Sequence, residues 1–576
     1  MHWFAVILQL VLLGSVWSQP NGAHIPLYRS KTQRVTRRDG QSTAIGLGDV
    51  LDVTYSALVQ VGGTQTPLVL DTGSSDLWLV SNTCTPNCTN AGVPLFSQAS
   101  LHTTGLEVRL LYGDSRTGTQ AAGPIGIDSA GITGLSVSDQ NFAAITSTNT
   151  TVLETGSAGI LGLGFPPIRY VSCVIWRELL AAELTNASSL KPRSSIPLAQ
   201  AMTSPMDRGS RRLDFPSFDF LSTSSTLQRK RDSVTGTSDS AATMAIASFA
   251  THGPLFTRFI SQNVLVAPLV TITLQRDTLA PGGNAGLLSL GALPPGVDAS
   301  QLTWVPVRGY TSAQGGLPPS RATPNEVYPL VWEIPMDNVY FDGVKLPRSS
   351  MSDMTISLSA LLDTGNSLIR GPQDIVEHIF AQLGGSDLTP PSIECGTPHN
   401  LSFEIGGSLF PVDPRDFLHM DLRDSSASDG SILCTPALAV TDPPGNGSFL
   451  YSWSLGDPFL KSVLSALYYG NLTHPSRDPP RVGLLSSVPQ NAGDALRDAV
   501  AQADAEGGFP VKSDAAPTGT FLATMTGIGG VPQATVYLKQ STSAARSVTV
   551  PSASISGTSV VLLIGTAFSF LLIALA

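Results

Sequence analysis

The tetrapeptide Leu-Asp-Thr-Gly occurs twice in the chain, each time at the end of an apolar run. Leu70 to Gly73 follow Pro67-Leu68-Val69, and Leu362 to Gly365 follow Ala360-Leu361. A carboxylate that enters the interior behind an apolar strand is costly unless it is hydrogen-bonded, bound to a metal or used in function. Asp-Thr-Gly is also a common turn signature, which is the alternative interpretation of a single copy. The repetition in matching contexts instead favours two half-sites that meet.

Two carboxylates held within about 3 Å of each other cannot both ionise, so they share one proton. One of them then acts as a base and the other as an acid. Such a pair can activate water against a peptide carbonyl without a metal and without a covalent intermediate. Asp71 and Asp363 are therefore the predicted catalytic pair, and we expect neither a metal nor another cofactor.

Composition and patterning predict an all-β protein with large loops. Short β-rich runs such as residues 264–274 recur between turn residues, and long amphipathic helices are scarce. At 576 residues the chain is long enough for two or more domains. Its formal charge of −10 makes it a poor candidate for binding nucleic acid, whose backbone selects positive surfaces.

The two ends of the chain carry the patterns of targeting segments. Residues 1–18 are dominated by an apolar run typical of a secretory signal peptide. Residues 19–38 are interpreted as a basic propeptide that is cleaved after Arg38, with a disordered basic arm as the alternative. Residues 546–576 end in an uncharged apolar tail after a polar spacer, which predicts a glycosylphosphatidylinositol (GPI) signal with Ser543 as the attachment residue. A transmembrane tail is the alternative.

Sequons and cysteines also suit a secreted glycoprotein. Asn-x-Ser/Thr sequons occur at Asn87, Asn149, Asn186, Asn400, Asn446 and Asn471. All but Asn87, which lies inside a cysteine pair, are predicted glycosylation sites. The 5 cysteines suggest two disulfides, Cys84–Cys88 and Cys395–Cys434, and leave Cys173 over.

Two stretches differ in composition from the rest. About residues 166–251, rich in Ser, Thr and basic clusters, are interpreted as an inserted surface loop with one helix from Val174 to Leu184. Within this loop, Arg229-Lys230-Arg231 is a second possible processing site. Residues 488–545 lose hydrophobic patterning and are interpreted as a Ser/Thr/Ala-rich stalk.

The residues around both aspartates resemble the pepsin family of aspartic proteases. Asp71 to Trp78 reads DTGSSDLW, a highly specific signature of that family. Further matches follow in the family's order at residues 111–115, 159–164, 302–307, 455–460 and 482–484. The resemblance covers about residues 50–487 and implies a bilobal fold with an active-site cleft between an N-terminal lobe, 39–300, and a C-terminal lobe, 301–487. It also implies an endopeptidase.

The resemblance implies roles for the neighbours of the pair. Thr72 and Thr364 would hydrogen-bond across a pseudo-twofold axis, and Gly73 and Gly365 would let backbone N–H groups approach the carboxylates. Ser74 would donate to Asp71. The flap and substrate-binding residues would be Tyr112, Gly113, Asp114, Trp78 and Ser367, with the Tyr112 hydroxyl near the Trp78 indole.

Two residues depart from the family pattern. Asn366 stands where the family usually has Thr or Ser, and it could shift the pKa of Asp363. Asp114 adds a carboxylate to the flap, which in fungal relatives accompanies tolerance of Lys at P1, the residue before the scissile bond. The arrangement of segments also resembles yapsins, the fungal cell-surface aspartic proteases.

These features together predict a monomeric protease that cleaves peptide or protein substrates at acidic pH on the cell surface. It would be held at the membrane by its lipid anchor. A catalytically weak or inactive surface glycoprotein that binds peptides is the alternative, favoured only by Asn366.

Overall fold

The computed structural model describes the larger part of the chain between residues 43 and 537. The described residues are 43–50, 54–86, 88, 92–113, 118–166, 174–189, 238–274, 286–317, 319, 323–420, 432–445, 449–509, 513–514, 521–525 and 532–537. Several predictions fall outside them: the signal peptide, the propeptide with Arg38, the anchor signal with Ser543, and residues Asp114, Cys173, Asn87 and Asn446.

The N-terminal half is built on a ten-stranded sheet in which one short strand supports the first aspartate. Strand β10 lies between β4, to which it is parallel, and β5, to which it is antiparallel. The apolar run that precedes Asp71 forms the buried end of β4. The strands in order are β30 (Ser513–Asp514), β2 (Gly48–Val50), β3 (Thr54–Val61), β4 (Thr64–Asp71), β10 (Gly159–Gly162), β5 (Leu77–Val80), β8 (Leu135–Ile145), β7 (Thr119–Ile132) and β6 (Thr103–Tyr112), with β9 (Ser147–Thr148) paired to β7.

The C-terminal half repeats this arrangement in a five-stranded sheet. Strand β27 is parallel to β19 and antiparallel to β20, as β10 is to β4 and β5. Asp363 follows the last residue of β19. The strands in order are β16 (Glu333–Pro335), β19 (Ser359–Leu362), β27 (Trp453–Leu455), β20 (Ile369–Gly371) and β26 (Leu438–Val440). The two Asp-Thr-Gly segments therefore leave equivalent strands of two related sheets.

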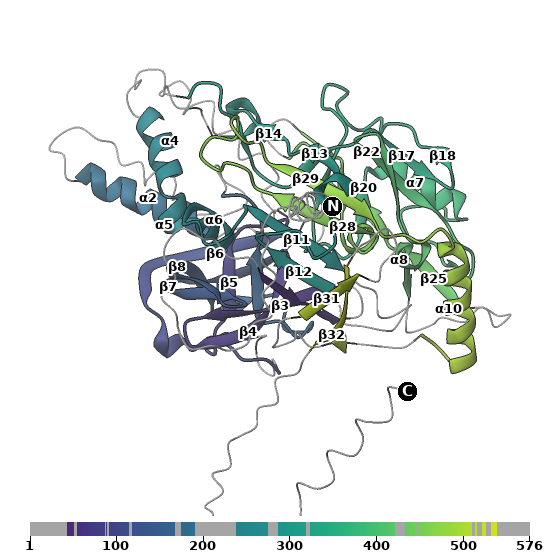
Figure 1. Ribbon diagram of the computed structural model, residues 1–576, viewed down its shortest axis with the longest axis horizontal. Helices are drawn as coiled ribbons and strands as arrows, with labels where there is room; N and C mark the ends of the chain where they lie inside the picture. Colours follow the sequence, from purple (N-terminus) through teal and green to yellow (C-terminus); the bar gives the residue numbers. More distant parts are fainter. Residues whose placement is uncertain are drawn as a thin grey trace, which may run out of the picture. The chain divides into compact units, whose positions relative to one another are not determined.

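A six-stranded sheet joins the two halves. It takes strands from both sides of residue 300, in the order β1 (Thr43–Gly46), β12 (Gly286–Leu290), β11 (Leu269–Leu274), β28 (Val463–Tyr468), β29 (Arg481–Ser486) and β13 (Thr303–Pro306). In Figure 1, β11, β12 and β28 run between the purple and blue strands β3 to β8 and the green strands β17 (Asn338–Phe341), β20 and β22 (Leu401–Ile405). The predicted all-β, two-lobed fold is confirmed.

The predicted surface loop at 166–251 is wrong at its C-terminal end. Helix α2 (Val174–Ser189) begins where a helix is expected, but α4 (Ser238–Ala247) and α5 (Phe249–His252) also lie in this span, before α6 (Leu255–Ser261). Trp176, Ala245 and Phe249 are buried in the main core. The Trp176 indole donates to the Ser248 hydroxyl at 2.7 Å, so the two ends of the span pack together. A composition dominated by Ser and Thr concealed these few apolar anchors.

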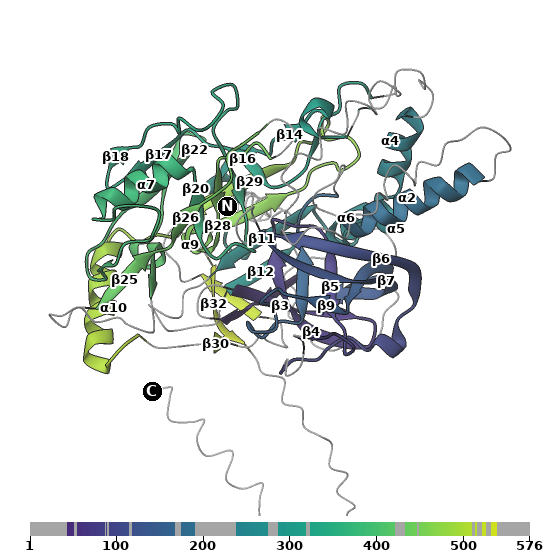
Figure 2. The ribbon, with the colours of Figure 1, turned by 180° about the vertical axis from the view of Figure 1, so that it is seen from behind.

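The predicted stalk is wrong at its start. Residues Ala492–Glu506 form α10, which packs near α8 (Pro414–Phe417) and lies beside β25 (Leu433–Pro436) (Figures 1 and 2). Leu496 is fully buried in the core. Farther on, β30 extends the large sheet, and β31 (Phe521–Met525) pairs with β32 (Pro532–Tyr537). The inner face of α10 uses alanine at two of its three buried positions, which left little hydrophobic pattern to detect.

Both expected cysteine pairs are present as disulfides. Cys84 is joined to Cys88, and Cys395 is joined to Cys434. The second bridge ties β25 to the end of β21 (Ile393–Glu394), which pairs with it. In the described part of the chain, no helix is both long and apolar enough to cross a membrane.

Candidate active site

The backbones of the two aspartates are hydrogen-bonded to the central short strands β10 and β27 or to the residue directly after them. The Leu163 N–H, just after β10, donates to the Asp71 carbonyl at 2.7 Å, and the Asp363 N–H donates to the Leu455 carbonyl of β27 at 3.1 Å. A Cβ on Gly162 would lie 2.3 Å from the Ser75 backbone, and one on Gly456 would lie 2.0 Å from the Asn366 carbonyl. Glycine is therefore required at both places because backbone packs on backbone.

Two threonines lock the loops together across the axis between the half-sites. The Thr72 hydroxyl donates to the Leu362 carbonyl, and the Thr364 hydroxyl donates to the Leu70 carbonyl, both at 2.8 Å. Each hydroxyl also accepts the other threonine's backbone N–H, at 2.9 Å for the Thr364 N–H and 3.1 Å for the Thr72 N–H. Both threonines are buried. These four bonds join segments almost three hundred residues apart and fix how the aspartates face each other.

Each carboxyl group lies against the glycine of the opposite loop. A Cβ on Gly73 would be 2.6 Å from Asp363 Oδ1, and a Cβ on Gly365 would be 2.6 Å from Asp71 Oδ1. Each glycine N–H also donates to the aspartate of its own loop, at 2.8 Å for Gly73 and 3.0 Å for Gly365. The same Cβ on Gly365 would lie 3.2 Å from Asp363 Oδ1, so the two carboxyl groups are immediate neighbours. The structure thus brings the two predicted residues into direct contact.

Burial raises the pKa of both carboxyl groups. For Asp71, the Ser74 hydroxyl and the Gly73 N–H offset part of this effect. For Asp363, the negative charge of Asp71 raises the pKa further, and the Gly365 N–H offsets part of the increase. Because Asp71 accepts the additional Ser74 hydroxyl, the pair favours a negative charge on Asp71 and the proton on Asp363.

Ser74 donates a hydrogen bond to the Asp71 carboxyl, whereas the Asn366 side chain donates to Ser454 and not to Asp363. The Asn366 Nδ2 donates to the Ser454 hydroxyl at 2.9 Å, and its Oδ1 accepts from the Arg370 Nε at 3.3 Å. The amide therefore turns toward β27 and β20. Ser367, the next residue, is half-buried in the same loop.

The predicted flap residues Tyr112 and Gly113 lie at the end of β6, which forms a hairpin with β7. Tyr112 ends β6, and Gly113 follows with a φ of 89°, a left-handed conformation that favours glycine. The Trp78 indole donates to the Tyr112 hydroxyl at 2.6 Å. Burial, with the charges of Asp76 and Asp71, raises the pKa of the Tyr112 hydroxyl well above the usual range, and the Ser74 side chain offsets a small part of this rise. Tyr112 therefore remains protonated at any pH at which a protease of this kind would work.

Two residues near the dyad were missed by sequence reasoning. Asp76, inside the DTGSSDLW signature, is buried and accepts the first N–H groups of α2, from Val174 at 2.8 Å and from Ile175 at 3.3 Å. Arg370 lies on β20, and its positive charge lowers the pKa of Asp363 against the larger effects of burial and Asp71. The signal that could have identified Asp76 is its place in the DTGSSDLW signature, where a carboxylate directly precedes an apolar strand. Nothing in the sequence ties Arg370 to Asp363.

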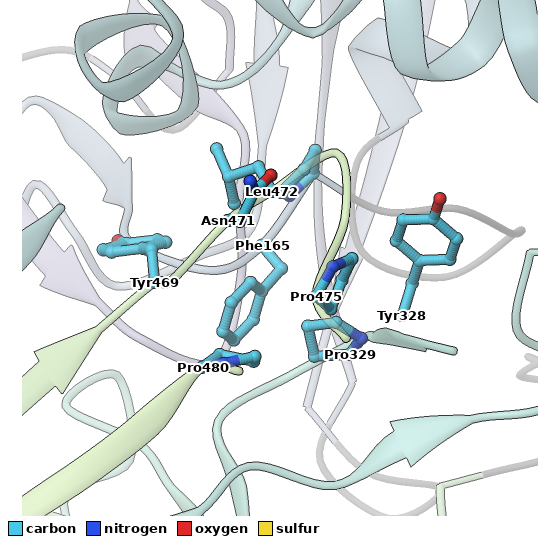
Figure 3. A pocket seen from close by; sticks show the side chains of 9 residues that line it. Phe165, Tyr328, Pro329, Tyr469, Asn471, Leu472, Pro475 and Pro480 are labelled. Carbon is cyan, nitrogen blue, oxygen red and sulfur yellow. The ribbon is translucent and has the colours of Figure 1, made fainter. Parts of the chain in front are cut away.

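Figure 3 shows a small pocket whose lining does not include either aspartate of the dyad. It lies beside an aromatic group that joins the halves, in which the Phe165 and Trp332 rings are 4.3 Å apart. Trp332 and Tyr469 both donate to the Leu163 carbonyl, at 2.9 and 2.6 Å. The lining residues are Phe165, Pro166, Tyr328, Pro329, Tyr469, Asn471, Leu472, Pro475 and Pro480. None of the residues predicted to act on substrate is among them.

The remaining predicted sites are partly described. Asn149 and Asn400 are exposed, and Asn471 is half-buried beside the pocket. Asn186 lies on α2. Among the residues with described positions, no group of three or more His, Cys, Asp or Glu side chains is placed to hold a metal ion.

Comparisons with known proteins agree with this architecture. The sequence model of the family described as eukaryotic aspartyl protease matches residues 54–190 and 218–473. The unmatched segment between them falls inside the predicted insertion. Cathepsin E-B of Xenopus laevis is 24% identical over 490 residues, which cover 83% of this chain and 89% of that protein.

Two further relatives come from a mammal and a fungus. Cathepsin E of Mus musculus is 24% identical, with 76% of this chain and 81% of that protein covered. Major aspartyl peptidase 1 of Cryptococcus neoformans var. grubii is 22% identical, with 75% and 71% covered. With the family model matching well over half of the chain and the fold in agreement, this protein belongs to the eukaryotic aspartyl protease family.

Proposed function

We propose that this chain is a secreted endopeptidase that hydrolyses peptide bonds at acidic pH with a water molecule held between Asp71 and Asp363. The observation that carries the proposal is the direct contact of the two carboxyls, each with a raised pKa, at the meeting point of the two Asp loops. A buried pair of this kind holds a single proton over a wide pH range. That state supplies both a base and an acid to one reaction.

The donors around the pair assign the two roles. Asp71, with its charge stabilised by Ser74 and Gly73, takes a proton from the water as its oxygen attacks the carbonyl carbon. Asp363 gives its proton to the carbonyl oxygen, which produces a tetrahedral diol. When the C–N bond breaks, the leaving nitrogen receives a proton from Asp71 and the diol returns one to Asp363. The pair ends in its starting state, so no cofactor is consumed.

The flap would close over this reaction. The Tyr112 hydroxyl accepts the Trp78 indole N–H, so a peptide bound under the hairpin would be shielded from bulk water. Asp114 directly follows Gly113 in the sequence. A carboxylate at that place favours substrates with a cationic side chain at P1 by charge attraction.

The cellular context of the proposal comes from the sequence. The apolar N-terminal run, the Arg37-Arg38 pair and the C-terminal tail support secretion, propeptide removal and attachment to the cell surface through a lipid. The relatives named as cathepsins and as a peptidase support proteolysis as the activity. The proposed substrates are peptides or proteins, and the proposed enzyme acts as a monomer.

Cleavage of a peptide library by the mature protein across about pH 3–7 tests the proposal. We expect cleavage at the acidic end, blocked by a statine-type inhibitor, and no cleavage by the Asp71→Asn variant. A peptide-binding protein without activity would give no cleavage products, and its Asp71→Asn variant would keep its biological effect. That result would replace the protease by the binding alternative.

A further inference from the structure

The two sides of the dyad differ at the third residue after each aspartate. Ser74 stands three residues after Asp71 and donates to its Oδ2. Asn366 stands three residues after Asp363, but its amide donates to Ser454 instead. From its own loop, the Asp363 carboxyl accepts the Gly365 N–H at 3.0 Å. In the part of the chain that the structure describes, the Asp363 side has no counterpart to the Ser74 hydroxyl.

The strand register places an arginine next to this gap. Arg370 of β20 lies opposite Ser454 of β27. Asn366 touches both residues, because its Nδ2 donates to Ser454 and its Oδ1 accepts from Arg370 Nε. The arginine also donates from its terminal nitrogen to the Val440 carbonyl of β26 at 3.4 Å. The guanidinium is held at two points, and its charge acts on Asp363.

Other charged groups near this position come from several elements. Asp71 faces Asp363 directly. Glu333 of β16 lies in register with Ser454 and Arg370 across the five-stranded sheet. Its carboxyl group forms an ion pair with Arg308 at 2.7 Å. Asp457 lies two residues after the end of β27, and its N–H donates to the Asn366 carbonyl at 2.8 Å. Asp442 lies two residues after the end of β26.

We propose that Asn366 and Arg370 act together as positioning residues that replace a hydroxyl donor on the Asp363 side of the dyad. Asn366 fixes the guanidinium, and the fixed positive charge stabilises the dyad's negative charge. The pair thereby lowers the upper pH limit of catalysis. This inference rests on the proposed function, because it concerns the proton that the two aspartates share.

The direction of the expected effect follows from the charge. Above the upper limit, Asp363 loses the shared proton and can no longer act as the acid. A positive charge nearby makes this loss easier, so it moves the limit to lower pH. Removal of the charge makes Asp363 hold its proton longer and extends activity toward neutral pH.

The test is the pH dependence of kcat/KM for an uncharged peptide, measured on the mature enzyme. Arg370→Met should move the upper limb to higher pH by about one unit and leave the lower limb in place. Arg370→Lys should keep the limb close to that of the natural enzyme. Asn366→Ala, which removes the amide that holds the guanidinium, should move the limb in the same direction by less. Asn366→Ser in the Arg370→Met background should bring it back, since a hydroxyl then stands where Ser74 stands on the other side.

Arg497→Gln is the matched control, because it removes one positive charge from the exposed face of α10, where Arg497 pairs with its helix neighbour Asp494 at 2.6 Å. It should leave both limbs unchanged. If Arg370→Met does not fold, the upper limb of the pH profile of Asn366→Ala tests the inference in its place. An upper limb that stays in place in these variants, in an enzyme whose cleavage depends on Asp71, overturns this inference alone. Absence of Asp71-dependent cleavage in the natural protein overturns the proposed function and this inference with it.

Discussion

At the scale of single residues, the site is an asymmetric pair within a symmetric frame. The threonine and glycine contacts repeat on both sides of the axis. Ser74, in contrast, donates to Asp71, whereas Asn366 donates to Ser454. Symmetric contacts fix the distance between the carboxyls, and the asymmetric ones decide which carboxyl keeps the proton. The motif residues Asp71, Thr72, Asp363 and Thr364 could be predicted from the sequence because two matching local patterns carry them. The role of Arg370 could not, since it depends on the register between β20 and β27.

Replacement of Ser74 by alanine tests the other side of this asymmetry. The hydroxyl stabilises ionised Asp71, so its loss should raise the pKa of Asp71. Asp71 is then protonated at a higher pH, and the lower limb of kcat/KM should move up by about one pH unit. The upper limb should stay near its original place. The measurement is the same pH profile, with Ser74→Thr as the control that keeps a hydroxyl; a lower limb that does not move would contradict the assignment of roles.

At the scale of elements, helix α2 supports the strand that carries the predicted flap residue Tyr112. Its residues Ile175 and Leu179 pack in one cluster with Val108 and Leu110 of the flap strand β6, and Asp76 caps its first turn. The start of this helix could be predicted from its apolar residues. Its contacts could not, because they join it to strands far away in the sequence.

The cap gives a prediction for α2. Asp76→Ala removes the acceptor for the Val174 and Ile175 N–H groups, which should lower the free energy of unfolding by about 1–2 kcal/mol. Asp76→Asn keeps one acceptor oxygen and should cost less. Chemical denaturation of the two variants measures the difference, and limited proteolysis should cut α2 earlier in the alanine variant. Equal stability of both variants and the natural protein would show that the cap does not hold the helix.

At the scale of the whole molecule, the two halves are joined by the six-stranded sheet and by contacts that meet at the Leu163 carbonyl. The all-β class could be predicted because turn residues punctuate many short apolar runs, and the two lobes could be predicted from the resemblance to the pepsin family. The packed start of the predicted stalk could not, since α10 buries mostly alanine. Alanine side chains give a weak hydrophobic pattern in the sequence. Only the packing of α10 in the structure shows that this helix is part of the folded catalytic domain.

The central claim is that one proton is shared between Asp71 and Asp363 across the join of the two halves. The most direct test is the pH profile of kcat/KM for an uncharged peptide with the mature natural enzyme. The account predicts a bell-shaped curve with two limbs, both abolished together with cleavage in Asp71→Asn and in Asp363→Asn. A profile governed by a single ionisation, or substantial cleavage by either asparagine variant, would contradict it.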